Sequence, residues 1–184
     1  MTRYRTIVAD PPWHYDGFAT QSRSTKWSGP VTTKPLPYGS MTLDEIAALP
    51  VESLAGDNCR LFCWTTNRYL PDSLRIIGTW GFTYRQTLVW HKRDGNMGGS
   101  VAPCSAEFLL VATRGKPERI AKMPSAVVTT AAPKQHSRKP EVFLDHIEAV
   151  SPGPYLELFA RRARFGWDYW GDQSLGTADL GEAA

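Results

Sequence analysis

The sequence predicts an α/β sandwich, in which helices cover both faces of a mostly parallel central sheet. Apolar, β-branched runs typical of strands alternate along the chain with segments of helical periodicity. The first apolar run, at 6–9, stops abruptly at Asp10-Pro11-Pro12, as a buried parallel strand does when it ends in a loop. The 184 residues are enough for one domain with a sizeable core.

The other elements are predicted from local patterns. Strands are expected at 58–66, 82–91, 107–113 and 155–159, with a shorter one at 127–129. Helices with apolar stripes are expected after a capping box at Thr42 and Glu45, after Pro71 and after Pro140. A single domain at 1–176 would then carry substrate loops near 15–37, 94–105 and 119–137, followed by a flexible tail at 177–184.

Composition limits the classes of function. A net charge of +3 permits a nucleic-acid partner without establishing one. No apolar stretch approaches the length of a membrane span, and the first residues lack the apolar core of a signal peptide, so a cytoplasmic protein without a membrane partner is expected. The three cysteines fit no zinc spacing, which predicts reduced thiols and no metal site.

The loop Asp10-Pro11-Pro12-Trp13 is the candidate catalytic segment. Its two prolines fix consecutive φ angles and lack N–H donors, so the loop offers hydrogen-bond acceptors and little else. Asp10 and the Pro11 carbonyl could accept both N–H bonds of a planar amine, while Trp13 could stack on the attached ring. An ordinary tight turn with a buried tryptophan explains the same residues equally well.

Basic and aromatic residues gather in the expected loops, as they do in proteins that grip a nucleic-acid backbone. The candidate substrate contacts of this kind are Lys26, Lys34, Lys92 and Arg93. Taken singly, each is more often a solvated surface charge. Glu107 has two equally supported interpretations, a surface carboxylate at a strand end or a group near the target base.

Four motifs in a fixed order are more specific than any one of them. They are Asp10-Pro11-Pro12-Trp13, Tyr38-Gly39-Ser40-Met41, His136-Ser137-Arg138-Lys139-Pro140, and Glu157-Leu158-Phe159-Ala160-Arg161 followed by Gly171-Asp172-Gln173. With them the chain resembles the S-adenosylmethionine-dependent adenine amino-methyltransferases, in the bacterial and phage branch of the family typified by the catalytic subunit of the messenger-RNA adenosine methyltransferase. The resemblance runs from about Thr6 to Gln173 and implies a Rossmann-like methyltransferase fold in permuted order.

The resemblance also implies residue roles. Asp10 and Pro11 would bind the adenine amino group beside the methyl group of the cofactor, and Tyr38 would border the target base. The residues implied for S-adenosylmethionine are Lys139 at the methionine carboxylate, Phe159 and Arg161 at the strand end facing the ribose, and Asp172 and Gln173 at the cofactor adenine. The chain departs from the family at Ala163 and Arg164, where the messenger-RNA enzyme has His-Asn, so the ribose contacts are open.

These expectations support direct, in-line methyl transfer to the N-6 amino group of an adenine flipped out of DNA. The same reaction on RNA is an alternative, and the compact chain without an attached RNA-binding module favours DNA. A non-catalytic nucleic-acid-binding partner subunit is a further alternative, which the retained Asp-Pro-Pro motif disfavours. The chain could act alone or as a homodimer.

Overall fold

The computed structural model describes residues 3–14, 40–93, 101–131 and 138–171. Its strands are β1 (Tyr4–Ala9), β2 (Ala55–Thr65), β3 (Thr83–Lys92), β4 (Ala106–Arg114), β5 (Val127–Thr130), β6 (Tyr155–Leu158) and β7 (Trp167–Trp170). Its helices are α1 (Leu43–Ala47), α2 (Val51–Leu54), α3 (Leu70–Thr79) and α4 (Glu141–Val150), with a 3-10 turn at Asn67–Tyr69. No helix among these residues is both long and apolar enough to cross a lipid bilayer.

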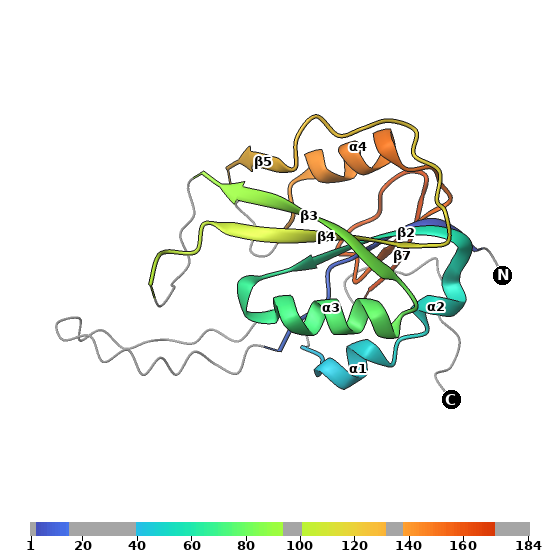
Figure 1. Cartoon of the computed structure of the whole chain (residues 1–184), viewed down its shortest axis with the longest axis horizontal. Helices are drawn as coiled ribbons and strands as arrows, with labels where there is room; N and C mark the ends of the chain where they lie inside the picture. The colour runs from blue at the N-terminus through green and yellow to red at the C-terminus, as the bar shows by residue number, and fades with distance from the viewer. Residues whose placement is uncertain (1–2, 15–39, 94–100, 132–137, 172–184) are drawn as a thin grey trace.

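The strands form one sheet in the order β5-β3-β4-β2-β1-β6-β7, with α4 on one face and α1 and α3 on the other (Figure 1). Within the described sheet, β4 alone runs antiparallel to its neighbours. The predicted mostly parallel α/β sandwich is therefore confirmed. β6, which the resemblance places on the cofactor side, pairs directly with β1 although it lies near the other end of the sequence.

Each strand and helix predicted from the sequence is found within a few residues of its expected position. The capping box before α1 forms, with the Thr42 hydroxyl accepting from the Glu45 N–H at 3.2 Å. Three elements were not predicted: α2, the 3-10 turn at Asn67–Tyr69, and β7. β7 lacks the alternation of apolar and polar residues that predicts a strand, because its four residues are three aromatics and Asp168. The Asp168 carboxylate accepts a 2.8 Å hydrogen bond from the hydroxyl of Tyr4.

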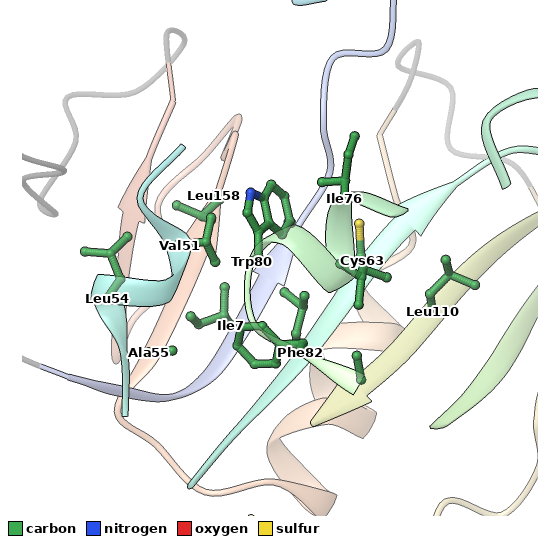
Figure 2. Packing of buried hydrophobic residues seen from close by; sticks show 14 of the residues in the cluster. Ile7, Val51, Leu54, Ala55, Cys63, Ile76, Trp80, Phe82, Leu110 and Leu158 are labelled. Atoms are coloured by element: carbon green, nitrogen blue, oxygen red, sulfur yellow. The ribbon is translucent and has the colours of Figure 1, made fainter. Parts of the chain in front are cut away.

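One half of the core lies between the sheet and the helices α1, α2 and α3. Figure 2 shows Trp80, directly after α3, close to Ile7 of β1 and Leu158 of β6. The Trp80 indole N–H is satisfied by the carbonyl of Ile46 at 3.2 Å, so the largest fully buried side chain leaves no donor unpaired. This packing fixes β1 and β6 in the middle of the fold.

The other half of the core lies between the sheet and α4. Phe143, Leu144 and Ile147 of α4 are buried against strand residues, Val8 among them. Because side chains alternate along a strand, Val8 faces α4 while its neighbours Ile7 and Ala9 face the opposite helices. Asp10 follows in the same alternation and falls on the α4 face.

The carboxyl ends of parallel strands share one edge of a sheet, where open α/β folds bind ligands. Asp10 follows β1 at this edge, Phe159 follows β6, and Lys92 ends β3. β4 runs the other way, so it begins here and contributes Glu107. The segment leading into α4 brings Lys139 to the same edge, as its contacts show below.

Candidate active site

The Asp-Pro-Pro-Trp loop is held at both ends by backbone hydrogen bonds. The Asp10 N–H donates to the carbonyl of Leu158 on β6 at 3.4 Å, which continues the pairing of β1 past its last residue. The Pro11 carbonyl accepts the Trp13 N–H at 2.9 Å, and the Pro12 carbonyl accepts the Met41 N–H at 3.0 Å. The two proline rings fix consecutive φ angles, so the loop is rigid. Because the prolines have no N–H donors, it needs few internal hydrogen bonds.

The structure places Trp13 in the core, which corrects the expectation that its indole offers a stacking surface. The residue is 4% exposed and stacks on Tyr69 with ring centroids 5.2 Å apart and an interplanar angle of 13°. Its indole N–H donates to the carbonyl of Trp64 at 3.3 Å. A substrate ring could stack on Trp13 only after this packing opened, so the indole is an anchor for the loop.

A chain of alternating charges crosses the carboxyl edge beneath the N-terminus of α4. The Lys139 Nζ atom lies 2.8 Å from Oδ1 and 2.9 Å from Oδ2 of Asp10, and 3.4 Å from Oε2 of Glu107. Glu107 in turn accepts a hydrogen bond from Lys92. The four side chains are between 10% and 19% exposed.

Burial opposes the charge of Glu107 and the charge of Lys139, but their charged partners outweigh it. Burial alone would raise the pKa of Glu107, yet Lys139 and Lys92 bring that pKa below its ordinary value. Burial alone would lower the pKa of Lys139, yet Asp10 and then Glu107 raise it above its ordinary value. At neutral pH Lys139 is therefore charged and fixed between two carboxylates.

These contacts exclude a surface carboxylate at Glu107, because the side chain is buried between Lys92 and Lys139; a role near the target base stays a prediction. Nothing in the local sequence could have indicated this. Lys92 is also buried, with its Nζ atom 4.8 Å from the ring centroid of Trp90, so it is placed to hold Glu107 more than to contact a phosphate. Arg93, the next residue, is exposed at the same strand end, and its contact with a phosphate stays a prediction.

The strand end after β6 has an unusual backbone. Phe159 has φ of 63°, in the left-handed region that few residues other than glycine adopt. Its ring meets Trp170 edge-on at 5.4 Å, and the Ala160 N–H donates to the Trp170 carbonyl at 2.9 Å. A Cβ atom on Gly171 would lie 2.4 Å from the Ala160 carbonyl oxygen, so the two strand ends can touch only because residue 171 is glycine.

Two arginines after β6 serve different elements. Arg161 lies near enough to Lys139 for its positive charge to oppose the increase in the Lys139 pKa, so it stands beside the site. Arg164 instead donates hydrogen bonds to Glu148 of α4 at 2.8 and 2.9 Å and to Asp145 at 2.7 Å. The residue that departs from the family pattern thus ties its loop to α4.

Glu157 is a site residue to which the sequence assigned no role. It pairs in register with Val8, so it faces α4 on the same side of the sheet as Asp10. Its Oε2 atom is fully buried and has no hydrogen-bond partner among the described residues. Burial, and then the negative charge of Asp10, raise the pKa of Glu157 to about 7. The available signal was an acid inside the apolar run Tyr155–Leu158.

The remaining predicted site residues lie outside the part of the chain that the structure describes. They are Lys26, Lys34, Tyr38, Asp172 and Gln173. The described part of the site therefore consists of the Asp-Pro-Pro loop, the charged chain built on Lys139, and the strand end at Phe159 and Arg161.

Comparison with known proteins adds independent findings. The family model described as MT-A70 matches residues 4–173. The type II methyltransferase M.MunI of a Mycoplasma species is 33% identical over 180 residues, which cover 92% of this chain and 77% of that protein. An N(6)-adenosine-methyltransferase MT-A70-like protein of Arabidopsis thaliana is 30% identical over 97% of this chain, and the human N(6)-adenosine-methyltransferase catalytic subunit METTL3 is 27% identical over 88%. The chain spans 25% and 26% of the length of these two plant and human relatives.

Proposed function

Because the chain belongs to the MT-A70 family, we propose that it transfers a methyl group from S-adenosylmethionine to the N-6 amino group of adenine in DNA. The observation that carries the proposal is the buried Asp10–Lys139 pair in the rigid loop directly after β1. DNA is favoured over RNA because the type II methyltransferase M.MunI, which acts on DNA, is 33% identical to this chain, against 30% and 27% for the two N(6)-adenosine-methyltransferases.

The described residues fit S-adenosylmethionine, the methyl donor that MT-A70 methyltransferases generally use. Its methionine end carries a carboxylate, for which Lys139 and the neighbouring Arg161 offer positive charge. It also carries an ammonium group, for which the buried oxygen of Glu157 without a partner is an available acceptor. When bound, S-adenosylmethionine supplies a methyl group activated by a positively charged sulfur.

Asp10 is the group proposed to hold the reacting amine. The exocyclic nitrogen of adenine is a weak nucleophile because its lone pair is delocalised into the ring, and hydrogen bonds from its N–H groups favour the pyramidal form. A carboxylate has about four acceptor positions, so Asp10 can accept an amine N–H while it stays paired with Lys139. The Pro11 carbonyl, which already accepts one N–H from Trp13, retains a second lone pair.

The same carboxylate also stabilises the product side of the transfer. The nitrogen gains positive charge as the methyl group arrives, and a preorganised negative charge next to it lowers the barrier. Lys139 fixes the direction of the Asp10 carboxylate, and Glu107 together with Lys92 fixes Lys139. Positioning of this kind contributes on the order of 7–11 kcal/mol in well-aligned bimolecular reactions.

The contacts to nucleic acid and to the cofactor adenine are proposed from the resemblance. A target adenine in a duplex must leave the base stack, which costs a few kcal/mol. Tyr38 is proposed to border this base, and Asp172 and Gln173 to contact the cofactor adenine. Arg93 is exposed at the carboxyl edge and suits a phosphate contact, with Lys26 and Lys34 as further candidates.

The test is methyl transfer from methyl-deuterated S-adenosylmethionine to unmethylated DNA and, in parallel, to RNA. Nucleosides released by digestion are identified by mass spectrometry. We expect deuterated N6-methyladenine in DNA with the native protein and none with Asp10→Asn. Label found only in RNA would show that RNA, and not DNA, is the substrate. If neither nucleic acid carries label although the protein binds the cofactor, the proposed enzymatic activity is wrong, and a non-catalytic partner subunit is favoured.

A further inference from the structure

Most of the described cations around the carboxyl edge already neutralise carboxylates. The lysines of the buried chain are held by Asp10 and Glu107. Three arginines form ion pairs with acidic residues of α4, namely Arg138, Arg162 and Arg164. Arg68 differs from them, because it is exposed and forms no ion pair with any residue that the structure describes. Its positive charge is therefore available to an anion outside the protein.

The turn that carries Arg68 is fixed on both sides. It is the 3-10 turn directly after β2. The Asn67 amide donates to Sγ of Cys104 at 3.4 Å, and the Tyr69 ring stacks on Trp13 of the Asp-Pro-Pro-Trp loop. The guanidinium carbon of Arg68 lies 5.6 Å from the centroid of the Tyr69 ring, a cation–π contact that neutralises no charge. A guanidinium oriented in this way loses less conformational entropy when it binds an anion.

The end of β2 lies beside Asp10, away from the strand end proposed to hold the methyl donor. β1 pairs in parallel with β2 on one side and with β6, which leads to Phe159 and Arg161, on the other. Lys139 reaches Asp10 from the α4 face, whereas Tyr69 packs in the core half on the opposite face. In direct, in-line transfer the sulfur and the accepting nitrogen lie on opposite sides of the methyl group. An adenine amine at Asp10 therefore approaches from the side of β2.

We propose that Arg68 binds a backbone phosphate of the DNA strand that carries the target adenine, an inference that rests on the function proposed above. With its amine held at Asp10, the nucleotide extends its sugar and phosphate outward over the end of β2, where Arg68 is exposed. The planar guanidinium can donate two parallel N–H bonds to two phosphate oxygens. Arg93 follows β3, which β4 and β2 separate from β1, so it suits a more distant phosphate.

The first measurement is the salt dependence of DNA binding. Fluorescence anisotropy follows the binding of a labelled mixed-sequence duplex with unmethylated adenines, in the presence of S-adenosylhomocysteine so that no methyl group is transferred. Each phosphate contact that releases a counterion steepens the plot of log affinity against log salt by about 0.9. Arg68→Gln is therefore expected to reduce the slope by about 0.9 between about 50 and 200 mM NaCl, and to weaken binding about tenfold at the lower salt concentration.

Steady-state kinetics provide a second measurement. A phosphate that is bound equally before and during methyl transfer lowers the KM for DNA without raising kcat. Arg68→Gln should therefore raise the KM for DNA about tenfold, with little change in kcat. The KM for S-adenosylmethionine should stay at its native value, which separates the phosphate contact from the cofactor site.

Two further variants separate phosphate binding from net charge and from packing on Tyr69. Arg5→Gln removes one exposed positive charge at the opposite edge of the sheet, where β1 begins, and should leave the salt slope and the KM for DNA unchanged. Arg68→Lys keeps the charge without the planar fork, so it should retain the native slope and recover part of the affinity. If Arg68 serves only to support Tyr69, Arg68→Gln lowers the unfolding free energy in urea and keeps the native slope, which contradicts the proposal.

The outcomes distinguish this inference from the function beneath it. If the native protein neither binds DNA nor transfers a methyl group to it, the proposed function fails, and the inference fails with it. If the native protein methylates DNA but Arg68→Gln keeps the native salt slope and the native KM for DNA, Arg68 binds no phosphate and the function stands. The same titrations with RNA of matching sequence complete the test, because an effect of Arg68→Gln on RNA alone would show that the bound strand is not DNA.

Discussion

The burial of Glu157 makes the stability of the free protein depend on pH in a predictable way. Glu157→Gln keeps the shape of the side chain and removes the charge that the fold buries. Raising the pKa of the carboxyl from 4.5 to about 7 means that its ionised form destabilises the folded state by about 3 kcal/mol. The variant should therefore gain stability relative to the native protein under conditions in which Glu157 is ionised.

The sign follows from proton binding. Between pH 4.5 and pH 7 the folded protein holds more protons at Glu157 than the unfolded chain, so stability falls as the pH rises through this range. Glutamine does not titrate. The unfolding free energy of Glu157→Gln minus that of the native protein should thus rise by about 2–3 kcal/mol between pH 5 and pH 9.

Urea unfolding followed by tryptophan fluorescence at pH 5, 7 and 9 measures this difference, and the seven tryptophans provide the signal. Other titrating groups are common to both proteins and cancel in the subtraction. Glu118→Gln, at an exposed carboxylate, is the matched control and should give a nearly flat difference. Parallel stability curves for the native protein and Glu157→Gln would refute the reasoning.

Three further perturbations test other parts of the site. Lys139→Met leaves buried carboxylates without their cation and is expected to cost about 3–5 kcal/mol in urea unfolding and to weaken S-adenosylmethionine binding in calorimetry. Gly171→Ala places a Cβ atom 2.4 Å from the Ala160 carbonyl oxygen and should lower the melting temperature, whereas Gly78→Ala, a helical site with open space, should raise it slightly. Acidification below pH 4.5 should reduce the unfolding free energy, because Glu107 has a lowered pKa and must take up a proton, and Glu107→Gln should weaken this dependence.

Each of these has a clear contrary result. If Lys139→Met folds and binds the cofactor with native affinity, Lys139 does not contribute to cofactor binding. Equal melting temperatures for Gly171→Ala and Gly78→Ala would show that the strand ends relax without cost. If Glu107→Gln loses stability in acid as the native protein does, other carboxyl groups cause that loss.

The fold was predictable wherever the signal is local. The apolar run before Asp10 marks a buried strand, and the capping box at Thr42 marks a helix start, because both depend on neighbouring residues alone. β7 was not, since Trp167–Trp170 becomes a strand only by pairing with β6. The position of Trp13 could not be predicted for the same reason. An indole suits stacking on a substrate and packing on Tyr69 equally, and only the tertiary contacts show that it packs on Tyr69.

The sequence motifs predicted several residues of the site, but they did not predict which other side chains the fold brings next to them. Asp10 and Lys139 belong to ordered motifs, and the structure brings them within hydrogen-bond distance. Glu107 enters the site because β4 is antiparallel and begins at the carboxyl edge, which no residue near position 107 specifies. Glu157 faces Asp10 because β6 pairs with β1 in a particular register, and a shift of one residue would turn it to the other face.

The central claim is that Asp10 holds the adenine amine during methyl transfer, and a single-turnover rate measures it most directly. Native protein and Asp10→Asn, each saturated with S-adenosylmethionine, are mixed with limiting DNA, and the appearance of N6-methyladenine is followed over time. We expect the variant to transfer methyl groups at least about 10²-fold more slowly, since it loses the charge that stabilises the developing cation. Transfer by Asp10→Asn at the native rate would contradict the claim.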